Sequence, residues 1–233
     1  MLMWTGNHTG RYTFSMVSAR TSRTISATLP ASAKPAPRGR RRPGEVDLDT
    51  LPPAGRRILA TASGLFYARG IGAVGVEQIA LEAGTTKKTI YDRFGSKEGL
   101  VTAYLQDRCR TWQQYVTEWL DHAKTSGPDR VLEPLHALDA WMRENDRGCG
   151  FVNAYAELAG TGHSGLTVIA EEKRVIRELY AQLLTEAGMD RVQDRATQLS
   201  IVHEGFIQQL AAGRHPAARE QAFVLGRLII DAD

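Results

Sequence analysis

Residues 76–100 read VEQIALEAGTTKKTIYDRFGSKEGL, and the rest of the chain can be interpreted outward from this stretch. Val76, Ile79 and Ala83 recur at helical spacing, so a first short helix should bury one face. Gly84 follows at the position where helices most often end in the left-handed region, which glycine adopts without steric cost. The stretch therefore predicts a short helix that stops at a tight turn.

A second short helix should begin directly after this turn. Thr86 can cap it, because the threonine hydroxyl can accept a hydrogen bond from a free N–H of the first turn. Ile90 and Phe94 fall on its inner face. The outward residues are cationic or carry hydroxyl groups: Lys87, Lys88, Thr89, Tyr91 and Arg93. Two short helices with these faces, joined by a glycine turn, indicate a helix-turn-helix unit.

The segments IALEAG, TTKKTIYDRF and SKEGL resemble the DNA-binding domain of the tetracycline-repressor (TetR) family, over about residues 56–104. One position departs from the family pattern. The family usually has a threonine before the first short helix, where it caps the helix and contacts a phosphate. This chain has Gly75 there, which caps only weakly and lacks the hydroxyl group.

Charge is distributed unevenly along the 233 residues. Residues 1–44 hold eight of the 29 lysines and arginines and none of the 26 acidic residues, so the remainder is mildly acidic. A uniformly basic protein would instead have indicated non-specific coating of nucleic acid. Two cysteines without metal-ligand spacing and no bilayer-length apolar run favour a reduced, cytoplasmic protein.

Residues 1–50 should form a disordered basic tail, because they have no sustained period and are rich in small polar residues, arginine and proline. The tail resembles a transit peptide in composition, but the following domain resembles a bacterial family. Met3 and Met16 are alternative starts, so part of the tail could reflect an upstream start codon. The run at residues 38–42 could follow a DNA groove, and a solubilising role is the alternative.

The rest of the chain predicts an all-α fold. Residues 51–105 are expected to form the helix-turn-helix DNA-binding domain, and residues 106–233 an effector-binding and dimerisation domain. No useful strand alternation appears. Outside the two short helices, we expect helices at about residues 54–69, 97–122, 130–144, 151–159, 166–187, 191–212 and 216–230. Gly188 and Gly213 stand where helix ends need glycine, and Pro134 must start or kink its helix.

The candidate DNA contacts lie on and beside the second short helix. Thr86, Lys87 and Thr89 are the candidates for base edges, because lysine can donate to guanine and a threonine methyl can meet thymine. The resemblance implies phosphate contacts for the tyrosine and the lysine of the motif. The candidates for phosphates are Thr85, Lys88, Tyr91, Arg93 and Lys97, with simple solvent exposure as the alternative for Arg93 and for any single lysine. One such unit covers few base pairs, so a homodimer on palindromic double-stranded DNA is expected.

The resemblance also implies two sites in the C-terminal half. The family dimerises through its last two helices, and small and apolar residues line both of these helices here. We expect them to serve both the dimer contact and the monomer's core, and a role in the core alone is the alternative. A pocket for a small-molecule effector is the second site. Its candidate residues are Arg108, Trp112, Tyr115, Trp141, Phe151, Asn153, Tyr155, His163, His203 and Phe206. Apolar walls with a few polar groups describe such a pocket, and they describe an ordinary core as well.

Catalytic interpretations of the sequence fail on context. Residues 70–75 spell G-x-G-x-x-G, but a helix precedes them and no strand is indicated. Residues 162–166, GHSGL, lack the last glycine of a nucleophile elbow. The histidines show no metal-binding pairing, and Cys149 is more simply an ordinary thiol than a redox sensor. We therefore predict neither an enzyme, nor a cofactor, nor a metal site.

Together these features predict a sequence-specific transcriptional repressor that a small-molecule effector releases from its operator. The alternative is a constitutive DNA-binding regulator whose C-terminal core is filled. The identity of the effector, the operator sequence, and repression as opposed to activation stay open at the level of sequence.

Overall fold

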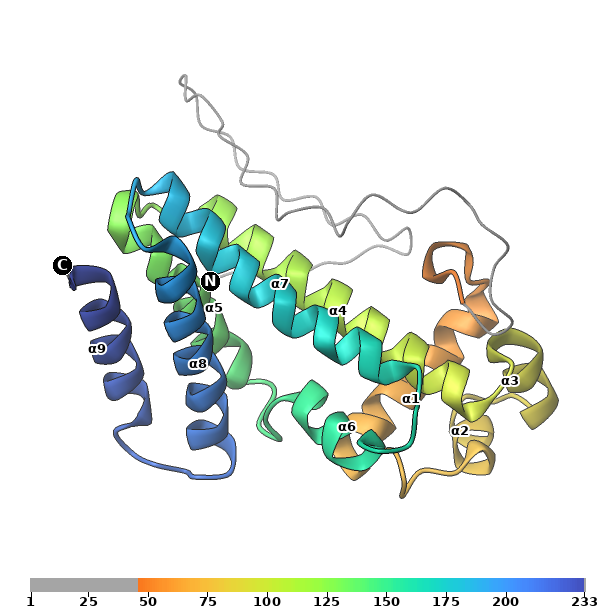
Figure 1. The fold of residues 1–233 in the computed structure, drawn as a ribbon. Coiled ribbons are helices and arrows are strands. Elements are labelled where there is room, and N and C mark those ends of the chain that lie inside the picture. Colours follow the sequence, from red (N-terminus) through yellow and green to blue (C-terminus); the bar gives the residue numbers. More distant parts are fainter. Residues whose placement is uncertain (1–45, 233) are drawn as a thin grey trace, which may run out of the picture.

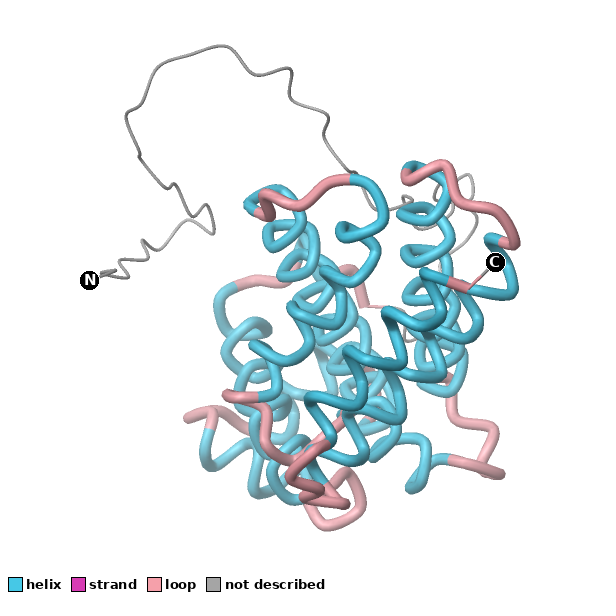
Figure 2. Tube along the Cα trace, turned by 90° about the vertical axis from the view of Figure 1, so that its left-hand side faces the viewer, coloured by secondary structure: helices cyan, strands magenta, loops and turns pink. Residues whose placement is uncertain are grey.

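The computed structural model describes residues 46–232, and these residues form helices joined by short loops, with no strand among them (Figure 2). The predicted all-α fold is confirmed. Most of the predicted tail, residues 1–45, lies outside the described residues. The elements in chain order are η1 (Leu48–Thr50), α1 (Pro53–Arg69), α2 (Val76–Glu82), α3 (Lys87–Phe94), α4 (Lys97–His122), η2 (Gly127–Leu132), α5 (Glu133–Met142), α6 (Gly150–Leu158), α7 (Gly165–Glu186), α8 (Val192–Ala211) and α9 (Ala218–Asp231).

Helices α1, α2 and α3 gather at one end of the molecule, and α8 and α9 lie at the other (Figure 1). The long helices α4 and α7 run side by side in the same direction between the two ends. The hydroxyl oxygens of Thr102, near the start of α4, and Ser164, just before α7, are 2.8 Å apart. The expected domain boundary at residue 105 falls inside α4, so one uninterrupted helix connects the helix-turn-helix to the body.

The predicted helix ends hold within a few residues, and three local expectations need correction. The helix expected from residue 130 begins at Glu133, because Gly127–Leu132 forms a 3-10 turn and Pro134 takes the first turn of α5, where its missing N–H does no harm. After α8 the left-handed residue is Arg214, with φ of 45°, and Gly213 is not left-handed. Residues 48–50, which we expected in the tail, form the 3-10 helix η1, and Asp49 pairs with Arg110 of α4.

One continuous apolar core runs from the helix-turn-helix into the body. No helix in the described part of the chain combines the length and apolar character that crossing a bilayer requires.

Candidate nucleic-acid interface and effector cavity

Helix α3 is held by its inner face and leaves its outer face to solvent. Ile79 of α2 and both Ile90 and Phe94 of α3 are fully buried. Gly84 has φ of +60°, and the N–H of Thr85 donates to the carbonyl of Ala80 at 2.9 Å, which closes the turn between the two helices. The predicted turn is therefore present, and it fixes how α3 projects from the molecule.

The predicted cap of α3 is confirmed. Thr86 is extended at the helix start, and its hydroxyl oxygen accepts a hydrogen bond from the N–H of Thr89 at 3.2 Å. The hydroxyl oxygens of Thr86 and Thr89 are 3.0 Å apart. Both side chains thus lie at the exposed first turn of α3, the part of a recognition helix that contacts bases in helix-turn-helix proteins.

Two cations of α3 pair with carboxylates of the same domain. The ammonium group of Lys87 lies 2.5 Å from the carboxylate of Glu77 on α2, and that of Lys88 lies 2.8 Å from Asp92. The Lys87 pair lowers the pKa of Glu77 and raises that of Lys87, mainly through their hydrogen bond. Exposed pairs of this kind contribute little stability, so a nucleic-acid phosphate or base can replace the carboxylate.

The other candidate DNA contacts differ in how free they are. Tyr91 is 45% exposed and Arg93 is also exposed, whereas Thr85 is half-buried. Lys97 is half-buried, and its ammonium group donates to the carbonyl of Ile71 at 2.7 Å. The neighbouring predicted cap is confirmed, because Ser96 accepts from the N–H of Gly99 at 3.0 Å. Lys97 therefore has an intramolecular partner that the sequence pattern did not indicate.

Helix α6 and the loop before it connect the body to the helix-turn-helix. The carboxylate of Glu157 accepts from the N–H groups of Ile71 and Gly72, at 2.9 and 2.6 Å, in the turn between α1 and α2. At the other end of α6, the hydroxyl of Tyr67 donates to the carbonyl of Gly148 at 3.1 Å. The glycine-rich segment that imitates a nucleotide-binding loop is thus the place where α6 binds α1 and α2.

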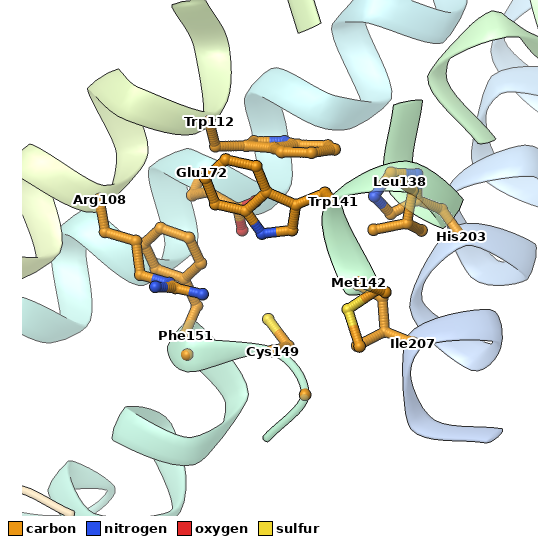
Figure 3. Close-up of a pocket in the computed structure, with 12 residues that line it drawn as sticks. Arg108, Trp112, Leu138, Trp141, Met142, Cys149, Phe151, Glu172, His203 and Ile207 are labelled. Atoms are coloured by element: carbon orange, nitrogen blue, oxygen red, sulfur yellow. The ribbon is translucent and has the colours of Figure 1, made fainter. Parts of the chain in front are cut away.

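The first residues of α6 also border a small cavity in the body (Figure 3). Its volume is about 30 Å³, which is enough for one or two water molecules but far less than a drug-sized ligand occupies. The lining residues are Arg108, Trp112, Leu138, Trp141, Met142, Gly148, Cys149, Gly150, Phe151, Glu172, His203 and Ile207.

Half of the predicted effector residues meet at this cavity, namely Arg108, Trp112, Trp141, Phe151 and His203. Of the other five, Tyr115 does not line the cavity but stacks on Trp112, which does, with ring centroids 6.0 Å apart. Tyr155 is 55% exposed, and His163 accepts from the N–H of Gly165 before α7.

The remaining two predicted effector residues also lie away from the cavity. The side chain of Asn153 donates to the carbonyl of Arg147 at 3.1 Å. Phe206 packs against Phe223 of α9, with ring centroids 6.1 Å apart. Both residues therefore have structural roles.

The buried polar groups of the cavity include two that the sequence reasoning missed, Glu172 and Cys149. Glu172 lies 3.0 Å from the ammonium group of Lys173, which also pairs with Glu204 and donates to the thiol of Cys149. Burial raises the pKa of Glu172 and of Cys149, although Lys173 opposes both shifts. The sequence predicted a helix at residues 166–187, but nothing in the local pattern indicated that a glutamate of this helix would be buried.

His203 is only 2% exposed, and burial lowers its pKa to about 3. Its Nδ1 atom lies 3.1 Å from the hydroxyl of Tyr180, which is itself fully buried. His203 is therefore a neutral imidazole at physiological pH. In the described part of the chain, no group of three His, Cys, Asp or Glu residues is arranged to hold a metal ion.

The last two helices carry an exposed apolar surface made of Ile201 on α8 and Val224, Leu225 and Leu228 on α9. Half of the small and apolar residues that we expected at a dimer contact, among them Ala196, Leu199, Ala222 and Gly226, are instead buried within the monomer. Exposed apolar residues grouped in this way are typical of protein–protein contacts.

Residues 58–104 match the sequence profile of the bacterial regulatory proteins of the tetR family. No protein of curated function matches the chain in sequence. Solved structures match over most of its length. A TetR-family transcriptional regulator from Streptomyces coelicolor is 25% identical, with a TM-score of 0.69, and the match covers 76% of this chain and 94% of that one.

Two further structures have the same fold at lower identity. A putative Tet-type transcriptional regulator from Streptomyces avermitilis is 22% identical with a TM-score of 0.67, and the match covers 78% of this chain and 98% of that one. Reduced NemR of Escherichia coli is 21% identical with a TM-score of 0.66, over 76% and 98% of the two chains. The similarity to the solved structures includes the helical body as well as the helix-turn-helix.

Proposed function

Because this chain belongs, through its helix-turn-helix domain, to the tetR family of bacterial regulatory proteins, we propose that it is a sequence-specific, DNA-binding transcriptional repressor. The observation that carries the proposal is the exposed, capped and cationic helix α3, held outward by the buried pair Ile90 and Phe94. A helix presented in this way can enter a major groove with its first turn.

The reading residues are Thr86, Lys87 and Thr89, and the phosphate contacts come from Thr85, Lys88, Tyr91 and Arg93. On DNA binding, Lys87 leaves Glu77 and contacts a base or a phosphate. Breaking the Lys87–Glu77 ion pair costs little free energy, because both side chains are exposed. Lys97 has a second role in addition to any phosphate contact, because its bond to Ile71 ties α4 to the turn before α2.

The repressor acts as a homodimer on a palindromic operator. The exposed residues Ile201, Leu225 and Leu228 of α8 and α9 supply the contact, and pairing these helices from two subunits buries them in a four-helix bundle. The dimer holds two α3 helices at a fixed separation, which must match successive major grooves on one side of the duplex.

A small-molecule effector in the cavity releases the operator. The first turn of α6 borders the cavity, and Glu157 near the end of α6 holds the turn before α2, so a ligand that moves α6 also moves the reading head. The ligand must bind the released state more tightly than the DNA-bound state, and a tenfold loss of operator affinity requires about 1.4 kcal/mol of such coupling.

The second candidate is a constitutive DNA-binding regulator without an effector. The small volume of the cavity, about 30 Å³, favours it, because a drug-sized ligand requires the surrounding side chains to move apart. A small molecule that dissociates the protein from its operator would exclude this candidate.

Selection of bound sites from random duplexes tests the DNA-binding proposal. We expect two similar half-sites in inverted orientation, about one helical turn apart or a multiple of this. The double variant Lys87→Ala and Thr89→Ala should fold normally but lose base preference by about 1–3 kcal/mol per lost contact. A matched control is Lys124→Ala, after the far end of α4, which should leave base preference unchanged. Unchanged sequence preference in the double variant would show that α3 is not the reading helix.

A further inference from the structure

The side chains that line the cavity include several hydrogen-bond donors, and one of these is the guanidinium group of Arg108, which interacts with the carboxylate of Glu172 only at longer range. In residues 46–232 no carboxylate lies within ion-pair distance of Arg108. The guanidinium of Arg108 lies over the ring of Tyr67, 4.3 Å from its centroid, and makes one long contact of 3.4 Å with the amide oxygen of Asn145. A guanidinium group has five N–H donors and can bind a carboxylate through two parallel hydrogen bonds, so Arg108 can still donate to a ligand in the cavity.

The tautomer of His203 makes it a second donor. The fully buried hydroxyl of Tyr180 has one described polar neighbour, the Nδ1 atom of His203 at 3.1 Å. The hydroxyl satisfies its O–H by donating to Nδ1, so Nδ1 carries no proton. The single proton of this neutral imidazole is then on Nε2, for which no hydrogen-bond partner is described. His203 lines the cavity opposite Arg108 and therefore presents an N–H donor to it (Figure 3).

Trp141 supplies a third donor. Its indole nitrogen faces the space beside Cys149 (Figure 3), and no hydrogen-bond partner is described for it. Trp112 meets Trp141 edge-on, with ring centroids 5.5 Å apart, and Phe151 completes an aromatic wall. The carboxylate of Glu172 also lines the cavity and lies 3.0 Å from the ammonium group of Lys173, which it shares with Glu204, so that Arg108 is the second positive charge beside these two carboxylates.

We propose that the ligand of this cavity is a small planar molecule with a carboxylate, whose oxygens bind Arg108 and whose flat apolar part packs against Trp112, Trp141 and Phe151. The donors of His203 and Trp141 then bind its remaining acceptor atoms. This inference rests on the proposed function for its biological role, but the binding site can be tested by itself.

Gly150 supports the assignment of Arg108 as the anion-binding group. A Cβ atom at Gly150 would lie 2.5 Å from the Nε atom of Arg108, so the absence of a side chain lets the guanidinium lie against the start of α6. The N-terminus of α6 begins at this glycine, and a helix N-terminus favours a nearby anion. The cation, the helix start and the aromatic wall thus converge on one carboxylate-sized position.

The test measures binding of three carboxylates of increasing size, acetate, benzoate and 2-naphthoate, to the full chain by calorimetry. The corresponding amides and benzylamine serve as neutral and cationic probes. We expect at least one carboxylate to bind about tenfold or more tightly than its amide, because a charge-assisted bidentate pair is stronger than neutral hydrogen bonds. Equal or tighter binding of the amides or of benzylamine, or no binding of any carboxylate, would overturn the inference.

Two variants and one matched control locate the site. Arg108→Gln should reduce the carboxylate preference about tenfold, and Gly150→Ala should do so by displacing the guanidinium while keeping its charge. Arg110→Gln is the control, because Arg110 is on the same helix but pairs with Asp49 outside the cavity. Circular dichroism verifies folding of each variant. If neither Arg108→Gln nor Gly150→Ala changes the affinity for the carboxylate, the ligand binds elsewhere and the inference is overturned.

Release of the selected operator separates this inference from the proposed function. A carboxylate that binds through Arg108 without releasing DNA supports the site and contradicts effector control by that ligand. A neutral or cationic probe that binds and releases DNA supports effector control and overturns the carboxylate assignment.

Discussion

Glu157 is the residue at which a single substitution should loosen the contact between the body and the DNA-reading domain. Its carboxylate accepts from two backbone N–H groups, those of Ile71 at 2.9 Å and Gly72 at 2.6 Å. The substitution Glu157→Ala removes both acceptors and leaves the remainder of α6 unchanged. A hydrogen bond to a charged group contributes about 1.5–3 kcal/mol when it is shielded, and much less when it is exposed.

Since Glu157 itself is exposed, we expect Glu157→Ala to lower the free energy of unfolding by about 1 kcal/mol. For a chain of this size that corresponds to a decrease in Tm of about 2–4 °C. The more specific readout is hydrogen exchange. The amides of Ile71 and Gly72 should exchange about fivefold faster, because 1 kcal/mol of protection is lost locally.

The matched control is Glu118→Ala, an exposed carboxylate on α4 for which no side-chain contact is described. Both variants are compared at one protein concentration, because the proposed dimer would make Tm depend on concentration. If exchange at Ile71 and Gly72 is the same in Glu157→Ala and Glu118→Ala, then Glu157 does not hold the turn, and the route by which α6 reaches the reading head is wrong.

Three further predictions concern the cap, the dimer and a buried histidine. Thr86→Ala should destabilise the protein by about 1 kcal/mol, measured by urea unfolding, and should weaken operator binding in a gel-shift assay, because the first turn of α3 loses its cap. The double variant Ile201→Asp and Leu228→Asp should convert a dimer to a monomer in sedimentation velocity. The two residues are 66% and 61% exposed in the monomer, so the variant should still fold without a partner. For His203, the folded pKa of about 3 lies below the ordinary 6.5, so its neutral form contributes full stability above pH 6.5 and progressively less as the pH falls toward 3. The variant His203→Phe should have a flatter dependence of unfolding free energy on pH between pH 7 and 5. His203 contributes at most about 1.4 kcal/mol per pH unit to this dependence in the unmodified protein. An unchanged dependence in the variant would contradict a neutral buried imidazole.

The helix-turn-helix was predictable because its determinants are local. The left-handed turn at Gly84 and the caps at Thr86 and Ser96 depend on neighbours within a few residues, and each was correct. The contacts of Lys87 and Lys97 were not predictable in the same way. Their partners, Glu77 and the carbonyl of Ile71, lie 10 and 26 residues away and become neighbours only after the helices pack.

The cavity was predictable only in part, because spacing identifies the inner face of a helix but not the helix that packs against it. Arg108 and Trp112 of α4 both line the cavity, whereas Tyr155 on α6 faces solvent. Glu172 was not predicted at the cavity, because a charged residue is usually exposed. Its burial depends on the ammonium group of Lys173, which also pairs with Glu204 on α8.

The small volume of the cavity, about 30 Å³, sets a threshold for any molecule that is to occupy it. A ligand larger than this volume requires conformers in which lining side chains such as Met142 have moved aside, and its apparent affinity is reduced by the fraction of molecules that adopt them. An open form at about 1% of the population makes the apparent Kd about a hundredfold weaker than the intrinsic one. Sensitivity can therefore be retuned by shortening Met142, which lines the cavity but is not among the residues proposed to bind the ligand or DNA.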